Sequence, residues 1–271
     1  MNQIFNIHRF TLAFRLEIAE RGRNYLLMAA LMAFAMTVLM VPVTMSREFS
    51  GFREVLHFFS LFLILLFGGS LFTSGALSQY TSSATGISGL MIPASTTEKF
   101  LSSLLFTLLF LVPLFCFYWW LHYYTLEIAN AKLTNQAFKY HPIPVDIVNY
   151  TTFGYFGIHA CVFFGSIFFK KNAYIKTAVV VIGIAFVVSV VNTMIAINFT
   201  DNPTRVTALP LSGWKLWYYN EDGNATKWRF ASIFYYLPLS DNLLLMAQLV
   251  TGAFIILLWM CAFYQLKERE I

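Results

Sequence analysis

Charged side chains are scarce in this sequence, and its longest apolar runs contain none. Lys and Arg number 18 and Asp and Glu number 13 among 271 residues, so 11% of the chain is charged, against roughly 25% in soluble domains. Hydrophobic residues make up 58% of the chain, and the mean hydropathy is +0.66. This composition excludes an ordinary soluble domain and predicts an integral membrane protein.

Six runs lack Asp, Glu, Lys and Arg over the ~20 residues that a helix needs to cross a bilayer. They are Tyr25–Val43, Val55–Leu77, Leu101–Tyr123, Tyr150–Phe169, Thr177–Phe199 and Leu243–Tyr264. The sequence therefore predicts an all-α polytopic membrane protein with six transmembrane helices, folded as a single transmembrane domain over residues 1–271.

Several chemical signatures are also missing from the sequence. Cys116, Cys161 and Cys261 all lie within the predicted spans, so no loop disulfide is available. No Gly-x-x-x-x-Gly-Lys-Ser/Thr phosphate loop occurs, which excludes nucleotide hydrolysis by that route. No Cys/His spacing is typical of a metal site. We therefore expect no catalytic residue, metal ion or cofactor on this chain.

The spans also lack the ionisable groups that proton- or sodium-driven carriers usually place inside the membrane. If the chain moves a cargo uphill, the energy is therefore expected to come from another polypeptide.

Basic residues are distributed unevenly around the predicted spans. With the N-terminus inside, the inner segments carry ten basic and five acidic residues, and the longer outer loops carry eight of each. The ten are Arg9, Arg15, Arg21, Arg23, Lys99, Lys170, Lys171, Lys176, Lys267 and Arg269. Because Lys and Arg are enriched in cytoplasmic segments, we expect both termini in the cytoplasm. The net charge of +5 then favours anionic lipid over nucleic acid as a partner.

The segment before the first span has a helical pattern of its own. Residues 3–21 place Ile7, Phe10, Phe14 and Ile18 on one stripe, with Arg9 on the other side. This pattern predicts an interfacial helix in the headgroup layer. The alternative is a simple juxtamembrane lead-in.

The connection 78–95 is the only long polar segment between spans that the charge pattern places on the cytoplasmic side. Ser, Thr and Gly dominate it, which favours a short surface helix or turn. Ser95-Thr96-Thr97-Glu98 fits a capping box, in which the serine hydroxyl and the glutamate carboxylate bind free amides at a helix start. The third span is therefore expected to begin at a fixed position.

Two groups of residues in the spans are candidates for a translocation path. Met28, Met32, Met36 and Met40 recur every four residues, and Met32 and Met36 lie at the centre of this polarizable stripe. Ser189, Asn192 and Thr193 form a polar group in the fifth span that must find partners within the protein. Helix packing is the alternative for the methionines, and interhelical hydrogen bonding for the polar group. Gly68-Gly69-Ser70 in the second span allows close helix approach.

The long outer loop, residues 200–242, is rich in aromatic residues. Trp214–Tyr219 and Ala225–Ala231 flank an Asp222-Gly223 step, which predicts a small extracytoplasmic hairpin. The following Ile233–Leu237 is too short to cross the membrane and is expected to dip into the outer interface.

Intramembrane chemistry has weak support. Gly86-Ile87-Ser88-Gly89 matches the short serine motif of rhomboid-like proteases by letter. However, Ser88 is predicted in a cytoplasmic loop while the histidines are predicted deeper or outside, so the serine has no base within reach. His57 and His122 share a predicted depth, but no ligand spacing supports a metal or haem site.

The segment Pro93–Leu101, with the sequence Pro-Ala-Ser-Thr-Thr-Glu-Lys-Phe-Leu, resembles the segment that opens the third span in permease subunits of type-2 ABC exporters, particularly those of the Bacteroidota type. The six-span plan, the inside termini, the amphipathic N-terminal lead and the polar second-to-third-span connection are similar as well. The long loop before span six departs from the shortest members of that family.

The resemblance implies an ATP-driven exporter subunit in the bacterial inner membrane. In that family, the connection between spans two and three carries a coupling helix that seats in a cleft of the ATPase, here expected within Tyr80–Leu90. The implied ATPase-coupling residues are Tyr80, Thr81, Ser82, Thr85, Gly86, Ile87 and Leu90, with Glu98 and Lys99 in support. Implied partners are a cytoplasmic ABC ATPase, which binds ATP and Mg²⁺, and a second permease copy or a related permease.

Two further classes of function remain as alternatives. The first is a non-transporting membrane subunit, for assembly or sensing, that binds a protein through its outer loop. The second, more distant, is an intramembrane enzyme. The identity of the cargo does not follow from the sequence, because apolar walls with a few Asn, Ser and Thr residues suit lipids, peptides and hydrophobic drugs alike.

Overall fold

The computed structural model describes residues 5–45, 47–81, 91–134, 139–200, 203, 205–208, 213–219, 232–238 and 240–269. The chain forms two compact units: unit 1 comprises Met1–Thr177 and Ile255–Ile271, and unit 2 comprises Ala178–Phe254. Six helical stretches in the described part are long and apolar enough to cross a membrane. The prediction of a helical membrane protein with six apolar spans is therefore confirmed.

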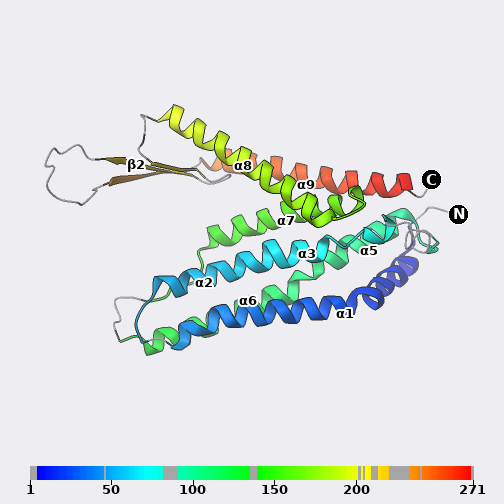
Figure 1. Ribbon diagram of the computed structural model, residues 1–271, viewed down its shortest axis with the longest axis horizontal. Coiled ribbons are helices and arrows are strands. Elements are labelled where there is room, and N and C mark those ends of the chain that lie inside the picture. Colours follow the sequence, from blue (N-terminus) through cyan, green and yellow to red (C-terminus); the bar gives the residue numbers. More distant parts are fainter. Residues whose placement is uncertain are drawn as a thin grey trace. The chain divides into compact units, whose positions relative to one another are not determined.

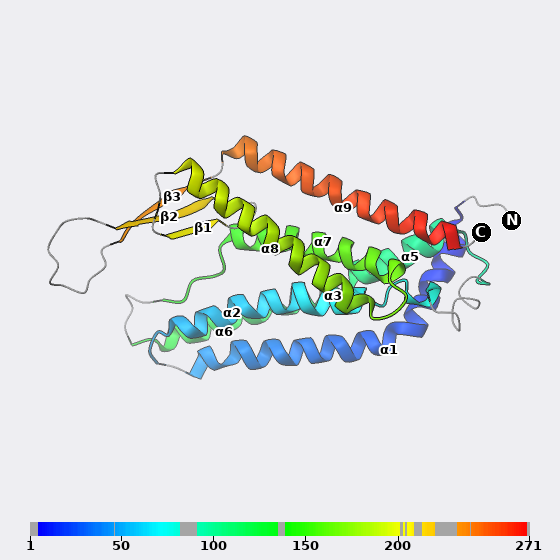
Figure 2. The same ribbon diagram turned by 45° about the horizontal axis from the view of Figure 1, so that its top comes forward.

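The first span belongs to a helix that begins well before it. Helix α1 runs from Ile7 to Met40 and ends in a 3₁₀ turn, η1, Val41–Met45. The predicted interfacial helix is thus the first part of a longer helix, and Figure 2 shows this dark-blue part set at an angle to the rest of α1.

The second span changes its helical geometry along its length. Helix α2, Gly51–Phe62, passes into a π-helical turn, η2, Leu63–Gly68, and then into α3, Gly69–Thr73, before the 3₁₀ turn η3, Ser78–Tyr80. A Cβ atom on Gly69 would lie 2.7 Å from a ring carbon of Tyr155 in α7, and one on Gly68 would lie 2.9 Å from the Met32 sulfur in α1. The predicted close helix approach at this glycine pair is therefore confirmed.

The third span is interrupted at Phe110. Helix α5 covers Thr96–Leu109, and α6 covers Leu111–Lys132. Pro113 lacks an amide N–H, and its ring clashes with the carbonyl of the residue four positions earlier, which is Leu109. The break therefore follows from one proline near the start of α6. In unit 1, α1, α2 with α3, and α5 with α6 run side by side (Figure 1).

A tight turn joins the fourth and fifth spans. Helix α7 covers Val145–Phe168, and α8 covers Ala173–Phe199. Asn172, in the turn, has a φ of 53°, which is the left-handed region that asparagine tolerates better than most residues. The turn also carries Lys170 and Lys171, two of the ten basic residues that the sequence assigns to the inner side.

Unit 2 contains a three-stranded antiparallel sheet in place of the predicted hairpin. Its order is β1-β2-β3, with β1 at Arg205–Ala208, β2 at Trp214–Tyr219 and β3 at Ser232–Leu237. Trp214 pairs with Leu237 and Tyr219 with Ser232. The first predicted strand is confirmed as β2.

The predicted second strand, Ala225–Ala231, lies outside the described residues. Within them, β2 pairs with β1 on one edge and with β3 on the other. The segment Ile233–Leu237 forms most of β3, and its location in the outer interface stays a prediction. Helix α9, Asp241–Arg269, follows and forms the sixth span.

The largest apolar core lies in unit 1 and contains the predicted methionine stripe. Met32, Met36 and Met40 are buried there. They pack in one cluster with residues of α2, η2, α6 and α7, among them Leu61, Ile64, Leu114, Tyr118 and Tyr155. The exposed fraction of Met36 and Met40 is 0%, which favours the packing alternative for this stripe.

Candidate functional site

The start of α5 is fixed by a reciprocal pair of hydrogen bonds. Ser95 Oγ accepts from the amide of Glu98 at 3.3 Å, and Glu98 Oε2 accepts from the amide of Ser95 at 2.8 Å. Both bonds of the predicted capping box are present. The connection 78–95 therefore ends at a defined helix start, because two otherwise unpaired amides are satisfied there.

The other oxygen of Glu98 binds the start of α1. Glu98 Oε1 accepts from the backbone amide of Asn6 at 2.7 Å and from Arg9 Nη2 at 3.1 Å. Asn6 is itself the cap of α1, since its side chain accepts from the amide of His8 at 2.9 Å. Glu98 is 0% exposed. One buried carboxylate thus lies at the N-termini of two helices, where the partial positive charge of both helix dipoles favours an anion.

A second polar contact joins the same two helices further along. The hydroxyl of Ser103 in α5 donates to Glu17 in α1, and Arg21 Nε lies 3.3 Å from the Glu17 carboxylate. Glu17 is buried, at 4% exposed. The contact makes Arg9, Ala13, Glu17 and Arg21 the face that the first part of α1 turns towards the protein.

The opposite face of this helix part is apolar and exposed. Ile7, Leu12 and Ile18 are 67%, 51% and 46% exposed, whereas Phe10 and Phe14 of the predicted apolar stripe are half-buried. A helix that turns Arg9, Glu17 and Arg21 towards the protein and exposes apolar side chains on its other face suits the headgroup layer. The interfacial location itself stays a prediction.

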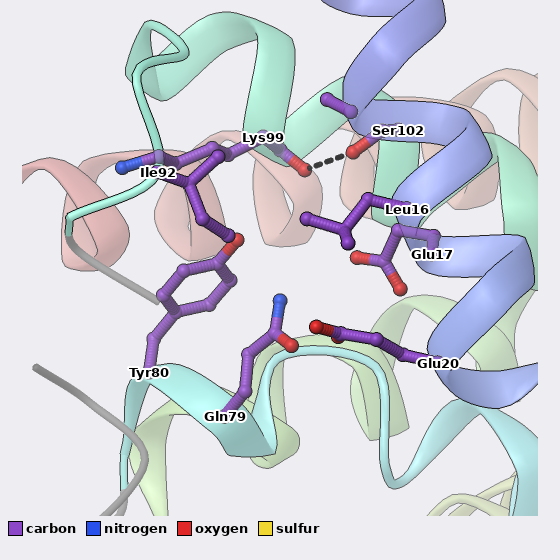
Figure 3. Close-up of a pocket in the computed structure, with 9 residues that line it drawn as sticks. Leu16, Glu17, Glu20, Gln79, Tyr80, Ile92, Lys99 and Ser102 are labelled. Atoms are coloured by element: carbon purple, nitrogen blue, oxygen red, sulfur yellow. Dashed lines mark hydrogen bonds between the residues drawn. The ribbon is translucent and has the colours of Figure 1, made fainter. Parts of the chain in front are cut away.

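A small recess lies between α1, η3 and α5. Ala13, Leu16, Glu17 and Glu20 of α1, Gln79 and Tyr80 of η3, and Ile92, Lys99 and Ser102 line it. Figure 3 shows Glu17 and Glu20 entering it from α1, while Gln79 and Tyr80 enter it from η3. Its empty volume of about 250 Å³ includes the open mouth, which is below the ~300–1,000 Å³ of typical small-molecule sites. The recess therefore suits a water molecule or a single polar side chain.

The predicted coupling residues divide into described and undescribed positions. Tyr80, Glu98 and Lys99 are buried and Thr81 is partly buried, so Glu98 and Lys99 hold the framework of the connection instead of forming its outer surface. The remaining predicted residues, Ser82, Thr85, Gly86, Ile87 and Leu90, lie outside the described residues. Their contact with an ATPase stays a prediction.

The two predicted path groups fall in different compact units. Met32 and Met36 belong to unit 1, whereas Ser189, Asn192 and Thr193 lie on α8 in unit 2. Within unit 2, Trp214 Nε1 on β2 donates to Asn192 Oδ1 at 3.4 Å. Asn192 therefore has a partner on the sheet, whereas the packing alternative for this group expected partners on other helices. Its role in a path stays a prediction.

Three residues of the site were missed from the sequence: Asn6, Glu17 and Ser103. The available signal was the four-residue spacing of Arg9, Ala13, Glu17 and Arg21, which places two arginines and a glutamate on one face of a helix. The sequence prediction used the apolar stripe of that helix and placed Arg9 on the side opposite to the stripe, without a partner. The structure gives Arg9 a partner in Glu98.

The buried histidines bind one another or a hydroxyl. His57 Nδ1 lies 3.0 Å from His122 Nδ1, and His122 Nε2 accepts from the amide of Ile143 at 3.3 Å. His159 Nε2 lies 3.1 Å from Thr107 Oγ1. Among the described residues, no group of three Cys, His, Asp or Glu side chains is placed to hold a metal ion. Ser88 of the protease-like motif lies outside those residues.

The start of α1 and the start of α5 thus form a joint in unit 1, held by Glu98 and Glu17. Residues of η3 line the recess beside this joint. No known protein family, curated protein or solved structure matches this chain.

Proposed function

We propose that this chain is the membrane-spanning permease subunit of an ATP-driven ABC transporter, working as an exporter in the bacterial inner membrane. The observation that carries the proposal is the fixed exit of the connection 78–95, where Glu98 binds the caps of both α1 and α5. Because the end of this polar connection is fixed to two helices, a soluble ATPase that binds the connection could move those helices.

Through this joint, a displacement of the connection would reach the membrane-spanning parts of α5 and α1. A partner that displaces the connection acts on the start of α5, and Glu98 and Glu17 pass that displacement to α1. Such a change is a rocking of packed helices, biased by the nucleotide state of the partner. The energy comes from ATP and Mg²⁺ on the partner subunit, because the six apolar runs contain no ionisable Asp, Glu, Lys or Arg.

The distribution of charge supports the inside location of this joint. The start of α1, the start of α5, the α7–α8 turn with the start of α8, and the end of α9 carry the ten basic residues assigned to the inner side. With two copies, or one copy and a related permease, a path would form between the subunits, and two ATPases would bind their connections.

Replacing residues 82–89 with a Gly-Ser linker of equal length is expected to abolish co-purification of a cytoplasmic ATPase in gentle detergent. Membrane insertion should persist, because the caps at Ser95 and Asn6 are retained. The measurement is a pull-down analysed by mass spectrometry, with the same replacement at residues 222–229 of the outer loop as the matched control.

Three outcomes would contradict the proposal. They are a wild-type pull-down that contains no ATPase, unchanged capture by the 82–89 variant, and labelling of a Thr85→Cys variant from the outside of intact cells. Capture of another protein that depends on residues 222–229 would instead support an assembly or sensing subunit.

A further inference from the structure

The end of α9 binds the beginning of the connection through one arginine. Arg269, in the last turn of α9, donates from Nη1 to the carbonyl oxygen of Tyr80 at 3.2 Å and from Nη2 to that of Ile167 at 2.8 Å. Tyr80 is the last residue of η3, and Ile167 lies in the last turn of α7. One side chain therefore joins three segments that are far apart in the sequence.

The chemistry of these carbonyls explains why an arginine serves here. The last carbonyls of a helix have no partner within the helix and must be satisfied from outside. The positive charge also suits the negative end of the α7 dipole. The planar guanidinium presents two N–H donors in a fixed fork, whereas a lysine ammonium is a single point of charge. Arg269 can thus satisfy both elements at once.

Apolar packing places Arg269 at this position. Ala262, Leu266 and Arg269 follow one another at helical spacing on α9, and Ala262 and Leu266 are 0% exposed. They pack in one cluster with Ala76, Leu77, Tyr80, Phe163 and Ile167. The amide of Leu77 also donates to Ser166 Oγ at 3.3 Å. The residues leading into the connection are therefore held against α7 and α9 by side chains and by backbone hydrogen bonds.

We infer that Arg269 is a positioning residue for the connection 78–95, which it fixes at Tyr80, the end opposite to Glu98. The connection then has two anchors, one on α9 and α7 and one on α1 and α5. The two anchors together contact four helices. The part of the inference that concerns coupling to an ATPase rests on the proposed function, but the anchor itself does not.

Hydrogen exchange of the purified chain in phospholipid nanodiscs tests the anchor without any partner. In an Arg269→Gln variant, we expect the amides of Leu77, Tyr80 and Thr81 to exchange about tenfold faster, because hydrogen bonds to a charged donor are lost where the segment opens locally. Arg269→Lys should give a smaller increase. The thermal midpoint of the chain should shift little, which separates positioning from a general loss of fold.

The matched control is Lys267→Gln, which removes one positive charge from the same helix turn at an exposed position. Unchanged exchange at Leu77–Thr81 in Arg269→Gln, or an equal increase in Lys267→Gln, would overturn the anchor. The ATPase pull-down separates the two proposals. Absence of an ATPase from the wild-type pull-down would remove the proposed function and leave the anchor standing, whereas normal capture with unchanged exchange would remove the anchor alone.

Discussion

Replacing Glu98 with glutamine is expected to loosen the start of α1 and to destabilise the chain by about 2 to 3 kcal/mol. The carboxylate accepts through both oxygens, from Ser95 on one side and from Asn6 and Arg9 on the other. A glutamine has one acceptor oxygen, so its amide group must face an N–H donor on one of the two sides. The Arg9 ion pair is also lost. Glu98 itself is 0% exposed, so an unpaired polar atom on its side chain is costly.

Thermal unfolding in detergent measures the loss, and hydrogen exchange at the amides of α1 locates it. Glu20→Gln is the matched control, since Glu20 is an exposed glutamate on α1, the helix that Glu98 binds, and its effect should stay within about 0.5 kcal/mol. An equal effect of the two substitutions would show that Glu98 does not join the helices as described.

Replacing Gly69 with alanine is expected to destabilise the chain by about 1 to 2 kcal/mol, although alanine is the better helix former. The new methyl group would lie 2.7 Å from a ring carbon of Tyr155. Tyr155 is buried in the main core, where overpacking typically costs ~1–3 kcal/mol of stability. The gain of up to ~1 kcal/mol in helix propensity offsets only part of this. The measurement is thermal unfolding, in which the variant should have a lower midpoint than the wild type.

Two neighbouring glycines provide graded controls. Gly68→Ala should have a smaller effect, because its methyl group would meet the flexible thioether of Met32. Gly154→Ala in α7 has no heavy atom within 4 Å of the new Cβ and should leave the chain as stable or slightly more so. If Gly69→Ala were as stable as Gly154→Ala, this result would contradict the close contact between Gly69 and Tyr155.

The features predicted correctly from the sequence are those that depend only on residues close together in the chain. Long uncharged runs must be helical in a bilayer, since lipid offers no partner for the backbone, and all six runs are helices. The capping box at Ser95 and Glu98 was visible because its two residues are three positions apart. The interruption at Phe110 could also have been predicted, from Pro113. It was not, because the composition of a span does not take the position of a single proline into account.

The features that were missed depend on contacts between distant residues. The bonds from Glu98 to Asn6 and Arg9 join positions 92 and 89 residues apart, and no local pattern selects that partner among the other acids. In the outer loop, Ile233–Leu237 is a short apolar run that periodicity alone does not assign. Its pairing with Trp214–Tyr219 is set by the fold, so the hairpin prediction did not include it.

The position of Glu98 also imposes an order on biosynthesis. Asn6 and Arg9 leave the ribosome first, but the carboxylate that binds them follows 92 residues after Asn6. At ~5–20 residues per second, that interval is roughly 5 to 18 seconds, during which two predicted spans have been made and the third is only beginning. The first part of α1 can thus dock only after the nascent chain has inserted its first hairpin, which makes this contact a late event in membrane assembly.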